Sequence, residues 1–411
     1  MGFKIYIGYI FLCFSFRSII SITVCKTELD YYTNENCWEN NDDDLNTTQI
    51  LRNWGFTAEE YEINTDDGYG LTIIRGYGTI TNPTPIVMGH AVLINSRGFL
   101  FLQNSSLAYQ IISSGHQIFL INFRGTEYSR KHVNLTSEDR EYWNFSWHES
   151  GYYDIPKVLE LVSNITYGQK AILVGYSMGS TTSLVYATSF PDEAAEKLLG
   201  IICLGTASLY KNTPSLLRVV AMLDPIVAPL GLRLWNGRFP LKQEIGPLFE
   251  LGSSDPILYN MMDMVHALFA GWNYKSVAPD KMPIFLNHVY DSTSVKTLQH
   301  YGQIVLSERF AKYDYGPTLN HKKYGTPRPP LYDFSKIKVK IAQFLGRNDV
   351  LCTAENGLRL QELLKPEYRC GVTVIADPRW HHLNFINHRD AESLLAIPVL
   401  NKIKAYEAGG C

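Results

Sequence analysis

Five residues near the middle of the chain, Gly175-Tyr176-Ser177-Met178-Gly179, constrain the fold more than any other segment. The apolar run 171–174 precedes them, and a stretch that can form a helix, residues 180–188, follows. A strand, a sharp turn and a helix around G-x-S-x-G form a nucleophile elbow: the glycines allow the tight turn, and the serine hydroxyl stands exposed at the end of the strand. Because so short a pattern also arises by chance, the rest of the chain must supply the partners that such a serine needs.

Apolar bursts recur along the chain with helical stretches between them, which is typical of a doubly wound α/β sheet. The expected strands are residues 85–88, 117–122, 171–174, 199–204, 339–345 and 371–375. Between residues 208 and 333 this alternation is lost, and the segment is instead rich in Leu, Met, Trp, Phe and Pro. We expect a mainly helical cap inserted there over an apolar pocket, and therefore a hydrophobic substrate.

A serine hydroxyl is a weak nucleophile, so it needs a base, and the base needs an orienting carboxylate. Asp349 follows the expected strand 339–345, and His382 follows the strand 371–375. Both residues would lie at the carboxyl ends of the strands, where open α/β sheets build their sites. With Ser177, they occur in the order Ser, Asp, His that α/β-hydrolases use.

Other residues compete for the same roles. Glu355 is expected inside the helix that follows Asp349, and Asp377 lies only five residues before the base, so we favour Asp349 as the acid. His381 and His388 flank the candidate base. Spacing alone does not separate His381 from His382.

Several segments, in the same order along the chain, resemble the acid lipase family, which includes gastric and lysosomal acid lipases. The resemblance covers nearly everything from Thr48 to the C-terminus. The segments that carry it are 54–56, 60–63, 65–70, 122–125, 128–130, 142–149, 153–156, 313–316 and 382–385, besides the elbow. The family's N-H-L-D-F motif aligns with residues 381–385, which implies that His382 is the base.

The resemblance also implies an oxyanion hole made of two backbone N–H groups, those of Met178 and Val92. Val92 belongs to the segment His90-Ala91-Val92, which aligns with H-G-L in the family. Ala91 stands where the family has glycine, and it would be strained if the backbone there were left-handed. In the elbow, Tyr176 and Met178 replace the family's His and Gln, and the cap lacks the family's cysteine pair.

The N-terminus reads as a signal peptide, with Lys4, an apolar run over residues 5–14 and a mixed stretch that ends near Cys25. Arg17 interrupts this stretch well before the roughly 20 apolar residues that a membrane anchor needs. Five N-x-S/T sequons also suit the secretory pathway: Asn46, Asn104, Asn134, Asn144 and Asn164. Cys37, Cys203, Cys352, Cys370 and Cys411 remain beyond this leader, an odd number that leaves one thiol free unless Cys25 stays in the mature chain.

The expected organisation is a signal peptide (1–25), a polar lead-in (26–47), an α/β-hydrolase core with a mostly parallel sheet (48–207 and 334–411) and a cap (208–333). A net charge of −3 gives no electrostatic case for nucleic acid. No cysteine and histidine spacing indicates zinc, and no cofactor or metal is expected.

The function expected from the candidate triad and the resemblance is hydrolysis of triacylglycerols or cholesteryl esters at a lipid–water interface, outside the cell or in the lysosome. A carboxylesterase of smaller esters and a weakly catalytic or non-catalytic lipid-binding relative are the alternatives.

Overall fold

The computed structural model describes residues 42, 45–80, 83–211, 213, 215–242, 246–247, 256–273, 276–277, 281 and 285–411. The expected signal peptide and nearly all of the expected polar lead-in lie outside the described residues. The first helix among the described residues is α2 (Thr47–Asn53), capped by the side chain of Asn46, which accepts a hydrogen bond from the Gln49 backbone N–H.

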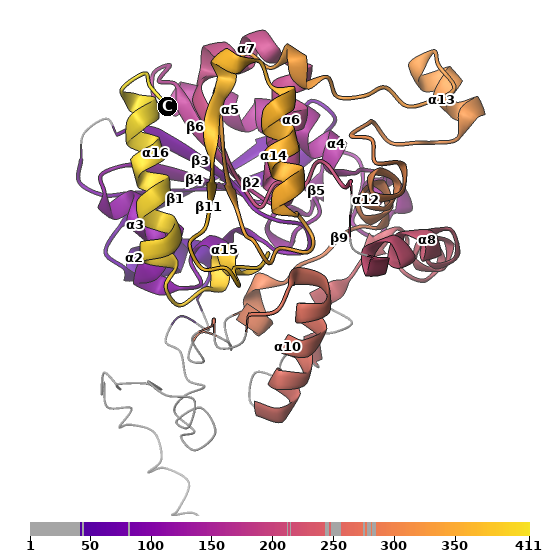
Figure 1. Cartoon of the computed structure of the whole chain (residues 1–411), viewed down its shortest axis with the longest axis horizontal. Helices are drawn as coiled ribbons and strands as arrows, with labels where there is room; N and C mark the ends of the chain where they lie inside the picture. Colours follow the sequence, from indigo (N-terminus) through magenta and orange to yellow (C-terminus); the bar gives the residue numbers. More distant parts are fainter. Residues whose placement is uncertain are drawn as a thin grey trace, which may run out of the picture.

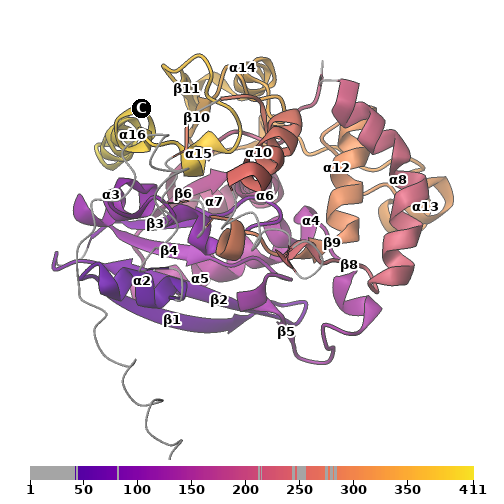
Figure 2. The same ribbon diagram turned by 90° about the horizontal axis from the view of Figure 1, so that it is seen from below.

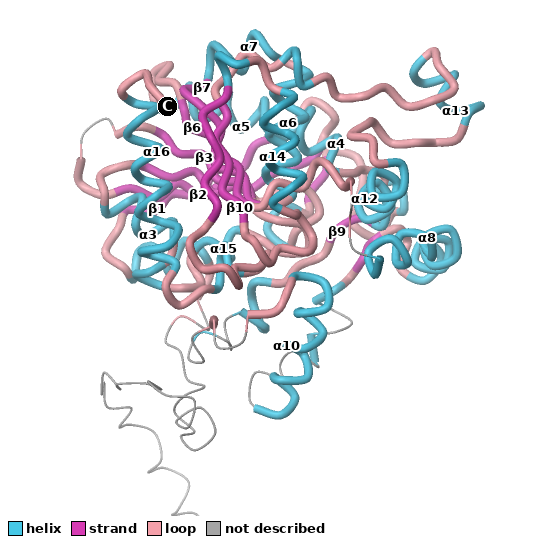
Figure 3. Tube along the Cα trace, viewed as in Figure 1, coloured by secondary structure: helices cyan, strands magenta, loops and turns pink. Residues whose placement is uncertain are grey.

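The core is a twisted sheet with helices on both faces (Figures 2 and 3). The order of its strands is β1-β2-β4-β3-β6-β7-β10-β11, and β5 pairs with β2. The strands are β1 (Thr57–Asn64), β2 (Tyr69–Tyr77), β3 (Pro85–Gly89), β4 (Gln117–Ile121), β5 (Lys131–His132), β6 (Ala171–Tyr176), β7 (Leu198–Leu204), β10 (Ile341–Leu345) and β11 (Arg369–Val374). The strands from β4 to β11 run parallel, while the first two form an antiparallel hairpin. The mostly parallel α/β sheet predicted from the sequence is therefore present.

The continuous apolar character of the central strands follows from burial on both faces. Alternate residues of β4 belong to two different core clusters: Ile118 and Leu120 to one, Phe119 and Ile121 to the other. The first cluster lies under α3 (Leu107–Ser113) and α16 (Ile397–Glu407), and the second under α5 (Ile155–Ile165), α6 (Met178–Ser189) and α14 (Ala354–Leu363). Such an alternation with a period of two is what a strand between two helical layers requires.

The remaining helices of the body are short. They are α4 (Trp147–Glu149), α7 (Pro191–Lys197) and α15 (Asn384–Asn387). The C-terminus is joined to the edge strand β11 by a disulfide between Cys370 and Cys411, whereas Cys203 and Cys352 are buried free thiols. Oxidation of one pair therefore leaves two free cysteines among the described residues, rather than the single one expected.

The connection between β7 and β10, residues 205–340, carries helices that stand away from the sheet (Figure 1). It contains α8 (Ser215–Leu234), α10 (Pro256–Ala270), α12 (Val295–Ser307), α13 (Pro317–Tyr324) and a small ribbon of β8 (Arg238–Phe239) and β9 (Thr293–Ser294). No helix among the described residues is both long and apolar enough to cross a bilayer.

Two conspicuous groups of the sequence have structural roles. The glycine-rich segment 67–70 spans the end of the β1–β2 hairpin turn and the first two residues of β2. Arg124 is buried and pairs with Asp67 at 2.6 Å, and its Nε donates to Asp154 at 2.9 Å. This ion-pair cluster ties the hairpin turn to the start of α5.

Candidate active site

Ser177 sits between β6 and α6 in the conformation that an elbow demands. Its φ of 53° and ψ of −110° lie in a region that is costly for a residue with a side chain. The turn is held by hydrogen bonds on both sides: the Ser177 N–H donates to the Leu204 carbonyl at 2.9 Å, and the Thr181 N–H donates to the Ser177 carbonyl at 3.1 Å. The strain is thus supported by the sheet on one side and by the helix on the other.

The two glycines of the elbow are required by close backbone packing. A Cβ on Gly179 would lie 2.0 Å from the Gly89 carbonyl oxygen, and one on Gly175 would lie 2.4 Å from the Gly179 carbonyl carbon. Real Cβ atoms essentially never come this close. Since neither glycine has a positive φ, their role is to let α6 pack directly against β3 and β6.

Ser177, His382 and Asp349 form a continuous hydrogen-bonded series. The Ser177 Oγ lies 2.8 Å from His382 Nε2, and His382 Nδ1 lies 2.7 Å from Asp349 Oδ2. All three side chains are buried. The other carboxylate oxygen of Asp349 accepts backbone N–H groups from Leu351 at 3.0 Å and Cys352 at 2.7 Å. A carboxylate fixed in this way holds the Nδ1–H tautomer of the imidazole and leaves Nε2 free to accept the serine proton.

The competing residues of the sequence lie elsewhere. Glu355 is on α14 and pairs with Arg359 at 3.1 Å, while Asp377 lies 3.4 Å from His388 Nε2. His381 Nδ1 accepts the Leu383 backbone N–H at 3.2 Å, and burial lowers the pKa of this imidazole to about 3. The structure brings none of these groups to Ser177 Oγ.

The two expected oxyanion donors emerge from neighbouring strands at the same level. Gly89 of β3 is paired with Gly175 of β6, and Val92 and Met178 each follow their paired glycine by three residues. Met178 is the first residue of α6, so its N–H has no acceptor within the helix.

The backbone around the first donor is unstrained at Ala91. The left-handed conformation falls on Leu93, with a φ of 63°, and Ala91 has no positive φ. The backbone strain that a left-handed conformation would have imposed on Ala91, where the family has glycine, is therefore absent. His90 fixes this loop, because Nδ1 bonds to the Ala91 carbonyl at 2.7 Å and Nε2 accepts the Phe123 N–H at 3.1 Å. Burial lowers the pKa of His90 to about 4, which keeps the ring neutral for this pair of bonds.

Two supports of the base were not anticipated from the sequence. The Tyr176 hydroxyl donates to the His382 carbonyl at 3.0 Å, and the His382 N–H donates to the Ala270 carbonyl at 3.0 Å. The first bond joins the elbow strand to the loop of the base, and the second joins that loop to the end of α10. In Figures 1 and 2, α10 accordingly lies beside α15. The departure of Tyr176 from the family's histidine was the only sequence signal for either bond.

Comparison with known proteins decides the family. Residues 47–103 match the profile described as a partial alpha/beta-hydrolase lipase region, and residues 85–220 match the alpha/beta hydrolase fold. Human lipase member N is 30% identical over 372 residues, which cover 88% of this chain and 92% of that protein. The chain belongs to the acid lipase family of α/β-hydrolases.

Other acid lipases are similar over the same length. Human lysosomal acid lipase/cholesteryl ester hydrolase is 27% identical over 88% of this chain and 92% of its own. A soluble variant of monoglyceride lipase from Saccharomyces cerevisiae, solved with a substrate analogue, shares the fold with a TM-score of 0.53 and 14% identity, over 86% of this chain and 96% of that one. As a member of this lipase family, the protein is a serine ester hydrolase.

Proposed function

We propose that the protein hydrolyses neutral lipid esters, triacylglycerols or cholesteryl esters, by two-step acyl transfer through Ser177. The observation that carries this proposal is the hydrogen-bonded series from Asp349 through His382 to a serine held at positive φ. In the first step His382 Nε2 takes the serine proton as Oγ attacks the ester carbonyl, and Asp349 stabilises the imidazolium that forms.

The Met178 and Val92 N–H groups stabilise the oxyanion of the tetrahedral intermediate in this proposal. Backbone donors suit the task because they are fixed before the reaction and need no reorganisation as the charge develops. His382 then protonates the leaving alcohol, and water attacks the acyl-enzyme by the reverse sequence to release the fatty acid. The series of proton transfers needs no metal and no cofactor.

We assign the role of a cap that meets a lipid surface to the β7–β10 connection. Its two long outer helices expose apolar side chains that a protein surrounded only by water does not gather on one element. Those exposed by more than half are Met222, Ile226, Val227, Leu230 and Leu234 on α8, and Met261, Met264, Val265 and Leu268 on α10. Because the Ala270 carbonyl at the end of α10 accepts the His382 N–H, this apolar surface is directly connected to the loop of the base.

We further propose that the protein works after passage through the secretory pathway, outside the cell or in the lysosome. The Cys370–Cys411 disulfide suits an oxidising compartment. All five sequon asparagines, Asn46, Asn104, Asn134, Asn144 and Asn164, are exposed, as glycosylation requires.

The decisive experiment measures hydrolysis of long-chain triglyceride and cholesteryl ester emulsions across pH, by the wild type and by Ser177→Ala. Loss of a triad serine removes about 10⁶ in kcat, which places the variant below detection. Ser183→Ala is the matched control, since its buried hydroxyl donates only to the Gly179 carbonyl one turn back in the same helix. We expect this control to retain activity.

The same preparations separate the alternatives. A short-chain ester panel that peaks at small soluble esters, with no gain above their solubility limit, contradicts the lipase assignment in favour of a carboxylesterase. A serine-reactive phosphonate should label the wild type and Ser183→Ala, but not Ser177→Ala. Failure to label the wild type contradicts catalysis altogether and favours a lipid-binding protein.

A further inference from the structure

A buried cysteine lies against the acid and the base of the candidate triad. Asp349, Cys352 and His382 each offer one ligand atom, and these atoms lie within 4.8 Å of one another. It is the one group of three such side chains in the part of the chain that the structure describes. Cys352 comes from the loop that follows β10, and its backbone N–H is bonded to Asp349 Oδ1, so the loop itself fixes the thiol beside the carboxylate.

The three side chains form a ligand set for a soft divalent cation. A carboxylate oxygen, an imidazole nitrogen and a thiolate sulfur all bind Zn²⁺, at about 2.0–2.3 Å. Tetrahedral bonds of that length place the ligand atoms roughly 3.3–3.8 Å apart. The longest of the present separations must therefore shrink by about 1 Å, while the 2.7 Å between His382 Nδ1 and Asp349 Oδ2 must widen by roughly 0.6 Å or more. Thiolate selects Zn²⁺ or Cd²⁺ over Mg²⁺ and Ca²⁺, which prefer oxygen ligands.

We propose that Asp349, Cys352 and His382 form an inhibitory site for Zn²⁺ or a cation of the same class. The cation enters between His382 Nδ1 and Asp349 Oδ2, which now share a hydrogen bond, and takes the Cys352 sulfur as its third ligand and water as its fourth. The thiol proton goes to solvent. The imidazole stays neutral, and its single proton moves from Nδ1 to Nε2.

This proton shift is the cause of the inhibition, which rests on the proposed role of His382 as the base. In the metal-free site Nε2 accepts from Ser177 Oγ across 2.8 Å. In the metal-bound site Nε2 carries the proton and becomes a donor, so it cannot take the proton of the serine. The nucleophile is left without a base, while the fold is unchanged and removal of the cation restores activity.

A purely structural role for the cysteine makes a different prediction. Cys352 also belongs to the core cluster under α5, α6 and α14, and a free cysteine commonly packs as a small apolar side chain. If packing is its only role, replacing it changes stability and leaves the sensitivity to metal as it was.

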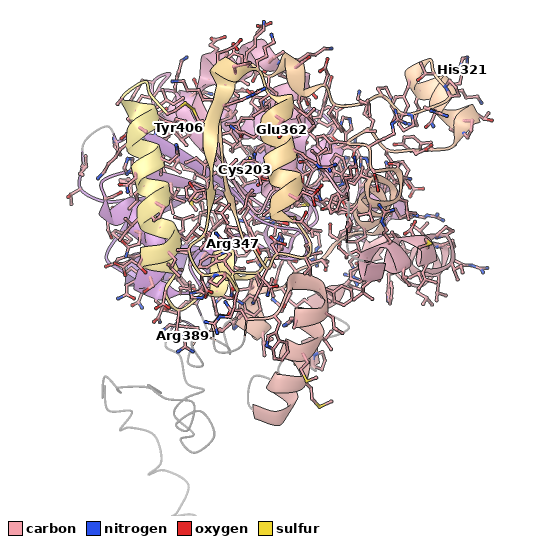
Figure 4. All side chains as sticks on the ribbon, in the orientation of Figure 1. Cys203, His321, Arg347, Glu362, Arg389 and Tyr406 are labelled. Carbon is pink, nitrogen blue, oxygen red and sulfur yellow. A yellow bond between two sulfur atoms is a disulfide. The ribbon has the colours of Figure 1, made fainter. Side chains whose placement is uncertain are left out.

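The first test compares Zn²⁺ inhibition of the full-length wild type, Cys352→Ala and Cys203→Ala on a soluble ester, each normalised to its own metal-free rate. Among the described residues, Cys203 on β7 is the second buried free thiol. Figure 4 labels it, together with Arg347, which follows β10. We expect reversible inhibition of the wild type and of Cys203→Ala, relieved by a chelator. Cys352→Ala should need at least about tenfold more Zn²⁺, since even the loss of an outer-shell partner costs that much. Equal sensitivity of all three proteins overturns the proposal.

The second test follows binding without catalysis. Cd²⁺ is titrated into Ser177→Ala protein, and the ultraviolet charge-transfer band of a cadmium–thiolate bond is recorded. We expect a band that corresponds to one site. It should persist in the double variant Ser177→Ala/Cys203→Ala and disappear in the double variants that combine Ser177→Ala with Cys352→Ala or Cys352→Ser. A band that depends on Cys352, together with a wild type that hydrolyses no ester, leaves the metal site standing and contradicts the proposed function. Ester hydrolysis without any such band defeats the metal site alone.

Discussion

The elbow glycine Gly179 offers a quantitative test of how tightly the site is built. In Gly179→Ala the new Cβ would lie 2.0 Å from the Gly89 oxygen and 2.5 Å from the Gly89 carbonyl carbon, whereas ordinary contact begins at 3.4 Å. Both atoms are backbone, so no side chain can rotate away. The start of α6 must therefore move by roughly 1 Å relative to β3.

That displacement moves Ser177 and the Met178 N–H away from the loop that carries Val92. A misplacement of about 1 Å at a reacting group costs on the order of 100-fold in rate, or about 2.7 kcal/mol of transition-state stabilisation. Overpacking a tight core costs about 1–3 kcal/mol of folding free energy in addition. We expect kcat/KM to fall about 100-fold and the thermal unfolding midpoint to fall with it.

The assay is hydrolysis of a soluble chromogenic ester together with a thermal unfolding scan. Gly302→Ala on α12 is the matched control, because its Cβ would meet Ala221 of α8 at an ordinary 3.8 Å. Replacing a helical glycine there should stabilise the protein by about 0.5–1 kcal/mol and leave activity unchanged. If Gly179→Ala keeps more than a third of the wild-type kcat/KM and the wild-type midpoint, the close packing of the elbow is not what positions Ser177.

Three further predictions concern the surroundings of the site. Tyr176→Phe removes the hydroxyl that bonds to the His382 carbonyl, and steady-state kinetics should show kcat reduced severalfold with KM unchanged. A rise in KM by the same factor as the fall in kcat would contradict a positioning role for this hydroxyl. Burial lowers the pKa of His300 from 6.5 to about 3, so the unfolded chain binds the proton first as the pH falls, and about 3 kcal/mol of unfolding free energy is lost by pH 4. Denaturant titrations from pH 7 to 4 should therefore show that the unfolding free energy of His300→Gln declines less steeply than that of the wild type. Cys411→Ser opens the disulfide to Cys370, closed over a separation of 41 residues, and should lower the free energy of unfolding by about 2–4 kcal/mol while kcat stays constant.

Local patterns were sufficient to predict the sheet. Each of the six strands expected from apolar bursts is present within two residues at either end, because strands buried on both faces are apolar throughout and are bounded by polar loops. The helix after the elbow was also predicted from local sequence, because a stretch that can form a helix follows the G-x-S-x-G pattern. The segment 67–70 was likewise predicted as a turn between strands: residues 65–68 join β1 to β2, and Tyr69 and Gly70 begin β2.

The candidate site needed more than local patterns. The order Ser177, Asp349, His382 and the strand-end positions came from the sequence, but spacing left His381 and His382 equivalent. The family's motif singled out His382. The physical reason is that neighbouring residues of a loop point in different directions, and the fold brings this imidazole to a serine 205 residues away. The same applies to the strain considered at Ala91, which depends on a backbone angle that residue identity does not fix.

The sequence by itself determined the α/β class, the elbow, the family and the residues available for a triad, because these follow from periodicity and from motifs of a few residues. The tertiary structure decided which of those residues meet: Tyr176 with the carbonyl of His382, Ala270 with its N–H, and Cys352 with the acid and base. These contacts join segments separated by up to about 200 residues, and hydrogen bonds act only across about 3 Å. The packing of the sheet and of α10 therefore had to be known before they could be seen.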